Sequence, residues 1–171
     1  MKAALDLAFS QLRSEMEYLT SGEVRIVCCG SGKVWEISGA AGKVGDRICQ
    51  FDRHDRHNQR WLLVCINVGM RLFEIKSPFC GHVADVFESK RENWVHLQVN
   101  SRNGGDNQRF VFEKTQIEGE YFLRAWHSNL VLDVEGISNA NNAPIIQWER
   151  HGGTNQRFRI ERITNPTQTN L

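Results

Sequence analysis

Apolar residues in the first part of the chain recur at intervals of three and four positions. This spacing places them on one face of an α-helix, and Gly22 stands where a helix C-terminal cap is expected. The sequence therefore predicts an amphipathic helix within residues 1–22, with the apolar face formed by Leu5, Ala8, Phe9, Leu12, Met16 and Leu19. We expect this face to contact the following domain. The alternative is that residues 1–20 contact a second copy of the chain or a partner subunit.

From Glu23 the pattern changes to short β-rich runs separated by polar and Gly-containing turns, which is typical of hairpins. Each of three segments, about 23–69, 70–118 and 119–163, contains four such runs, so twelve strands are expected. They are Val24–Val27, Val34–Ile37, Arg47–Phe51, Trp61–Val64, Leu72–Ile75, Val83–Val86, Trp94–Val99, Phe110–Phe112, Tyr121–Arg124, Val131–Val134, Ile145–Trp148 and Phe158–Ile160. Residues 164–171 are rich in Thr and Asn and predict a flexible tail.

One tetrapeptide occurs once in each segment. Its copies begin at Asn58, Asn107 and Asn155 and read Asn-Gln-Arg-Trp, Asn-Gln-Arg-Phe and Asn-Gln-Arg-Phe. A period of about 48 residues indicates a repeat architecture. The Gln and the aromatic residue are two positions apart and share one face of a strand. We therefore expect the three aromatic rings to share one core, and each Gln to find hydrogen-bond partners in nearby turns.

Three Gln-x-Trp/Phe motifs at this spacing resemble the ricin B-type (R-type) lectin family over about residues 23–163. The resemblance implies an all-β fold, a β-trefoil of twelve strands in three pseudo-symmetric repeats, here preceded by the N-terminal helix. In that fold a six-stranded barrel is capped by three hairpins. The function implied is carbohydrate binding.

The resemblance implies that each repeat can hold a shallow sugar site, as in similar lectins. An acidic residue accepts hydrogen bonds from sugar hydroxyls, an aromatic ring on the third strand covers the C–H face of the sugar, and the Asn of the motif adds an amide. The acid lies 22 positions before the motif Asn, and the ring lies 7 before it. The third repeat has every residue type required, at Asp133, Trp148, Asn155 and Gln156.

The other two repeats depart from this set. The first has Glu36, Phe51, Asn58 and Gln59, and its acid is one methylene longer. The second has Asp85, Asn107 and Gln108, but Asn100 replaces the ring, so this site is expected to be weak or absent. Some family members have a Gln two positions before the ring. Only the second repeat keeps it, since the three residues there are Cys49, Gln98 and Ile146.

Composition excludes several other functions. The net charge of +1 argues against a nucleic-acid partner and against a polybasic membrane surface, and no apolar run is long enough to cross a bilayer. Neither a secretory signal peptide nor a cysteine framework is evident, which favours the cytoplasm, or release without a signal peptide. We expect no metal, no cofactor and no catalysis, because no zinc-like spacing, phosphate loop or ordered nucleophile and base is present.

The leading hypothesis is a lectin-like protein that recognises a galactose-type or related glycan, mainly through the third repeat. One alternative is a β-trefoil that acts as an inhibitor or as a complex subunit docking through residues 1–20. Another is the targeting subunit of a toxin or glycosidase. Binding to glycans distinguishes the first and last of these from the second.

Overall fold

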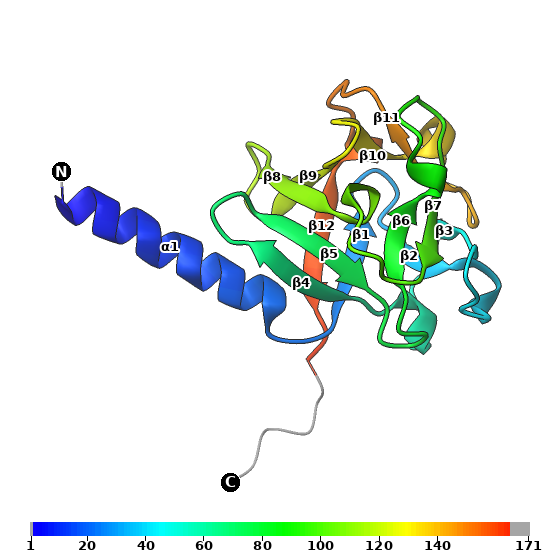
Figure 1. The fold of residues 1–171 in the computed structure, drawn as a ribbon, viewed down its shortest axis with the longest axis horizontal. Coiled ribbons are helices and arrows are strands. Elements are labelled where there is room, and N and C mark those ends of the chain that lie inside the picture. The colour runs from blue at the N-terminus through cyan, green and yellow to red at the C-terminus, as the bar shows by residue number, and fades with distance from the viewer. Residues whose placement is uncertain (1, 165–171) are drawn as a thin grey trace, which may run out of the picture.

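The computed structural model describes residues 2–164. Within that range one α-helix precedes twelve strands (Figure 1), which confirms the predicted fold class. The helix α1 spans Lys2–Thr20. The strands are β1 (Val24–Cys28), β2 (Val34–Ile37), β3 (Ile48–Phe51), β4 (Leu62–Asn67), β5 (Leu72–Lys76), β6 (Val83–Val86), β7 (Leu97–Asn100), β8 (Phe110–Lys114), β9 (Glu120–Ala125), β10 (Val131–Val134), β11 (Ile145–Trp148) and β12 (Phe158–Arg162).

Six of the strands form a closed ring. Antiparallel pairing runs from β1 through β12, β9, β8 and β5 to β4. Two hydrogen bonds between Val24 and Trp61, of 2.8 and 3.0 Å, join β4 back to β1 and close the barrel. The remaining strands form the hairpins β2–β3, β6–β7 and β10–β11, one from each repeat. A six-stranded barrel with three hairpins is the β-trefoil expected from the sequence.

The largest errors in the predicted strand boundaries are three residues. β4 ends at Asn67, three residues beyond the predicted Val64. The third strand of the second repeat was expected over Trp94–Val99, but β7 begins at Leu97. Trp94 has φ of +73°, and this left-handed conformation is incompatible with an extended strand. Of the predicted flexible tail, 164–171, all residues except Thr164 lie outside the described range.

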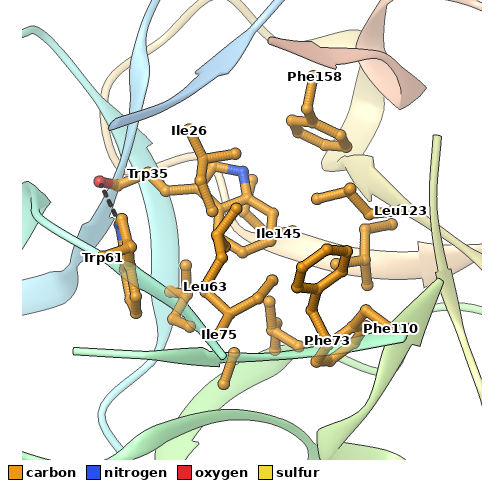
Figure 2. Packing of buried hydrophobic residues seen from close by; sticks show 14 of the residues in the cluster. Ile26, Trp35, Trp61, Leu63, Phe73, Ile75, Phe110, Leu123, Ile145 and Phe158 are labelled. Carbon is orange, nitrogen blue, oxygen red and sulfur yellow. Dashed lines mark hydrogen bonds between the residues drawn. The ribbon is translucent and has the colours of Figure 1, made fainter. Parts of the chain in front are cut away.

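The three motif aromatics, Trp61, Phe110 and Phe158, are fully buried in one hydrophobic cluster. Trp35 of β2 lies between two of them (Figure 2). Its ring meets Trp61 edge-on at 6.1 Å between centroids and meets Phe158 edge-on at 5.4 Å. The matching positions of β6 and β10 hold Ala84 and Leu132. The core is therefore asymmetric, because the first repeat supplies the large central ring.

Only the second half of α1 rests on the barrel. Met16 and Leu19 are buried in the core cluster and Leu12 packs against it. The first half projects away from the body of the domain (Figure 1), and Leu5 and Phe9 are exposed there. The expected contact with the following domain is thus made by one half of the apolar face. No helix among residues 2–164 has both the length and the hydropathy needed to cross a bilayer.

A cluster of polar contacts also anchors α1. The Glu15 carboxylate accepts hydrogen bonds from the Tyr121 hydroxyl at 3.0 Å and from Arg71 at 3.2 Å, and it pairs with Lys114 at 2.8 Å. Burial alone would raise the pKa of Glu15, but Lys114, Arg71 and Tyr121 together lower it below its usual value. A lowered carboxyl pKa stabilises the fold above the unfolded-state pKa, about 4.3, and this contribution is lost as the pH falls through the folded-state pKa.

The variant Glu15→Gln is therefore expected to be less stable than the wild type at pH 7. The difference should shrink as the pH falls below about 4.3 and vanish below the folded-state pKa, where the wild-type carboxylate has also lost its charge. Urea unfolding of both proteins between pH 7 and pH 3 measures this difference, and comparing the two removes contributions from the other acidic residues. A difference that stayed constant with pH would show that the charge on Glu15 does not anchor the helix.

Candidate functional site

Corresponding elements of each repeat supply the candidate residues. The acid is the third residue of β2, β6 or β10, and the position predicted to carry the ring is the last residue of β3, β7 or β11. The Asn-Gln pair lies in a short 3-10 turn before the fourth strand. These turns span His57–Gln59, Asp106–Gln108 and Thr154–Gln156. The fold therefore brings the Asn-Gln pair next to the acid in each repeat, although the Asn and the Gln follow the acid by 22 and 23 positions.

In the third repeat the acid is held by two amides. One oxygen of Asp133 accepts a hydrogen bond from Asn155 at 2.9 Å, and the other accepts from Gln156 at 2.8 Å. His151 Nε2 lies 3.4 Å from the second oxygen. An ionised carboxylate has about four acceptor positions, so capacity remains on the oxygen that Asn155 contacts. Asp133 is therefore fixed in direction but can still accept hydrogen bonds.

Gln156 links several groups of the fold by hydrogen bonds. Its amide nitrogen also donates to the carbonyl oxygen of Glu149 at 2.9 Å. Its amide oxygen accepts from the backbone N–H groups of His151 at 2.9 Å and Gly152 at 3.1 Å. All of its polar atoms are thereby hydrogen-bonded inside the protein. Gln156 therefore orients Asp133, and the predicted residues that remain available to a ligand are Asp133, Asn155 and Trp148.

A surface cavity of about 190 Å³ opens beside Asp133. It brings together three of the predicted residues, Asp133, Trp148 and Asn155, with five others: Trp94, Gly136, Ile137, Ile146 and His151. Burial raises the pKa of Asp133, and this outweighs the opposite effects of Gln156, Asn155 and His151. The carboxylate should consequently become protonated, and lose acceptor capacity, at a higher pH than a solvent-exposed aspartate.

The first repeat places the same residue types differently. Glu36 accepts hydrogen bonds from Gln59 at 2.8 Å and is paired with His54 at 2.7 Å. Asn58 does not bond to the acid and donates to the carbonyl oxygen of Ile37 at 3.1 Å. The half-buried Phe51 lies beside His54, with 5.9 Å between ring centroids. The longer acid is therefore paired with His54, and only one of the two amides, that of Gln59, donates to it.

In the second repeat the protein's own amides occupy the acid. Asp85 is 1% exposed and accepts from Asn107 at 3.0 Å and from Gln108 at 2.9 Å. Gln98 donates to its other oxygen, Oδ1, at 3.1 Å. Asn100, which stands where a ring would be, approaches Oδ2, the oxygen that Asn107 and Gln108 contact, at 3.5 Å. Little acceptor capacity remains for a ligand.

A protein-family model described as ricin-type beta-trefoil lectin domain-like matches residues 11–103 and 106–170. The chain belongs to this family of lectin-like domains. Membership supports carbohydrate binding as its general function, and the domains of this family are lectin-like and generally non-enzymatic. The sequence resemblance is therefore confirmed.

Three individual proteins illustrate the relationship. The structure of the designed three-fold symmetric protein ThreeFoil has a TM-score of 0.80 and 29% identity, and the match covers 83% of this chain and 99% of ThreeFoil. An exo-β-1,3-galactanase from Clostridium thermocellum has a TM-score of 0.79 and 26% identity, covering 83% of this chain and 30% of the galactanase. The clotting factor G alpha subunit of Tachypleus tridentatus is 41% identical over 51 residues, which are 30% of this chain and 8% of that protein. The matched region is thus a minor part of each of the last two proteins, and the lectin-like domain spans much less than their full length.

Two features of the lectin-like domain were not predicted from its sequence. The first is a histidine four positions before the motif Asn, His54 in the first repeat and His151 in the third, which contacts the acid in both. Counting four positions back from the motif Asn finds a histidine in the first and third repeats and Asn103 in the second. This shared histidine was the signal available in the sequence. The second is Trp94, which comes from the second repeat but lines the cavity of the third.

The cysteines and histidines among residues 2–164 are not grouped as metal ligands. Across residues 2–164, no three His, Cys, Asp or Glu side chains are grouped so that they could hold an ion. The five cysteines are free thiols, and burial raises the pKa of Cys49 to about 12. A thiol with so high a pKa is not a nucleophile at neutral pH.

Proposed function

We propose that this lectin-like domain binds a galactose-type glycan, mainly through the third repeat. One observation carries the proposal. Asp133 is oriented by two amides, keeps free acceptor capacity and faces an open cavity beside Trp148. The equivalent acids are less available, because Asp85 is saturated by amides and Glu36 is paired with His54.

The chemistry of the third site suits one face of a pyranose. The free acceptor position on the Asp133 carboxylate can take a hydrogen bond from a sugar hydroxyl, and charge-assisted bonds of this kind are the strong ones. Trp148 offers a ring for the apolar C–H face of the sugar, and the Asn155 amide can serve a further hydroxyl. The similarity to part of an exo-β-1,3-galactanase supports galactose as the sugar type.

Asp133→Asn is expected to weaken glycan binding by at least about tenfold, because a charge-assisted hydrogen bond contributes about 1.5–3 kcal/mol. Trp148→Ala, which removes the stacking ring, is expected to weaken it by up to about tenfold. A glycan array on the intact protein identifies the ligand, and calorimetry on the variants measures the loss. Asp85→Asn is the matched control, since it makes the same change at the saturated acid and should leave binding intact. Binding that survived in the double variant Asp133→Asn, Trp148→Ala would rule out the third site.

A second candidate function is docking to another protein through α1. The observation that favours it is the projecting half of the helix, where Leu5, Leu7 and Phe9 are all exposed. Such a contact would suit a subunit that carries glycan recognition to a toxin or glycosidase partner, or a second copy that adds avidity. An array with no signal would favour docking without glycan recognition.

A further inference from the structure

Neighbouring repeats are joined by a recurring backbone hydrogen bond. In the loop before its third strand, each repeat has one residue whose N–H donates to a carbonyl oxygen near the end of the third strand in another repeat. The bonds run from Gly45 to Val99 at 2.9 Å, from Trp94 to Gln147 at 3.1 Å, and from Asn142 to Gln50 at 2.9 Å. Each candidate site is therefore bordered by a loop from a different repeat, and Trp94 borders the third.

The residue that makes this bond is left-handed in all three repeats. Its φ is +94° at Gly45, +73° at Trp94 and +65° at Asn142. Glycine and asparagine adopt this conformation readily, whereas a bulky aromatic residue is strained there. Backbone strain that persists in a native structure is concentrated at functional sites. The second repeat thus has a strained residue where the other two have tolerant ones.

The Trp94 side chain gains little burial in return for this strain. It remains 59% exposed, and its ring meets Trp148 edge-on, with centroids 4.5 Å apart and planes at 78°. Ile137 on the same cavity shows the same combination, with φ of +54° and 67% exposure. Two apolar residues with strained backbone conformations therefore expose their side chains to solvent beside Asp133.

The other two sites lack an equivalent ring. Gly45 contributes no side chain to the second site, and Asn142 contributes a short polar one to the first. In the third site the two indole planes are nearly perpendicular. A sugar ring stacked on Trp148 would therefore leave the face of Trp94 free for a different sugar ring.

We propose that Trp94 is a second sugar-binding platform, so that the third site recognises at least a disaccharide. This inference rests on the proposed function of that site. Asp133, Asn155 and Trp148 hold the first sugar, and the face of Trp94 buries the apolar C–H surface of the next. Specificity for the linkage between the two sugars follows, because the second ring must reach a platform fixed at 78° to the first.

Calorimetry on Trp94→Gly with two probes, methyl β-galactoside and β-1,3-galactobiose, tests this role. Affinity for the disaccharide should fall about tenfold, as expected for losing one ring contact. Affinity for the monosaccharide should stay within about twofold of wild type. The variant should be about as stable as wild type in urea, because relief of the strain at a φ of +73° offsets the lost contact with Trp148 and the greater freedom of glycine in the unfolded chain. A disaccharide loss caused by misfolding is thereby distinguished.

Asn142→Gly is the matched control, since it changes the equivalent residue beside the first site and should alter neither affinity. Equal weakening of both probes in Trp94→Gly, or no weakening of the disaccharide, would overturn the second platform while leaving the glycan site in place. If the wild-type protein bound neither probe and gave no signal on the array, the proposed function would fail, and the platform with it.

Discussion

Replacing Trp35 with alanine is expected to lower the free energy of unfolding by about 3–5 kcal/mol, the usual cost of removing a large buried aromatic side chain. Trp35 is fully buried and touches the motif rings Trp61 and Phe158, so the loss leaves a cavity at the centre of the core. The matching residue of β6 is already small, since it is Ala84. The second repeat therefore has no side chain there that could fill the space.

Urea unfolding followed by circular dichroism measures the effect of Trp35→Ala. Trp35→Leu is the control, because leucine is the residue that β10 uses at Leu132, and it should recover part of the loss. An unchanged urea slope would show that the two variants unfold to comparable states. A loss below about 1 kcal/mol in Trp35→Ala would show that the core closes around the missing ring.

The second large effect is expected at Gln156. The variant Gln156→Ala removes donors from the Asp133 carboxylate and the Glu149 carbonyl, and an acceptor from two backbone N–H groups. Leaving buried groups without partners costs about 1–3 kcal/mol each, partly relieved by water, so we expect a loss of about 2–4 kcal/mol. Glycan binding should fall as well, because Asp133 is no longer held in direction.

Gln108→Ala separates the two consequences of this change. Gln108 makes matching hydrogen bonds in the second repeat, to Asp85, to the Ser101 carbonyl and from the Asn103 N–H. Its loss should cost about as much stability as the loss of Gln156. Glycan binding should survive it, because the second site is already closed. If Gln108→Ala reduced glycan affinity as strongly as Gln156→Ala, the effect would come from general destabilisation and not from the orientation of Asp133.

The repeat made the fold predictable from sequence. Three copies of the Asn-Gln-Arg-aromatic tetrapeptide at one period placed the fourth strand of each repeat, and all three motif rings are buried as expected. Strand periodicity did not predict Trp94 correctly, because an aromatic residue before a β-rich run favours an extended backbone. Trp94 is left-handed and donates its backbone N–H to Gln147 in the next repeat, a contact that local pattern cannot reveal.

The site was predictable only in its parts. Counting from Asn155 identified Asp133 and Trp148, and the structure brings both to one cavity. The same count placed Asn58 beside Glu36, where the added methylene and His54 take the carboxylate away from it. Sequence spacing thus predicts which side chains lie near each acid. Which of them donates a hydrogen bond to the acid depends on their three-dimensional positions.

The loop that joins one repeat to the next limits how the Trp94–Trp148 pair could have originated. An ancestor made of three identical second repeats would have Trp94 at every junction but Asn100 in place of the facing ring. Three identical third repeats would have Trp148 at every site but Asn142 beside it. No exactly triplicated version of either repeat contains both indoles at one junction. Copying either present-day repeat three times would therefore remove the pair, which depends on the second and third repeats being different.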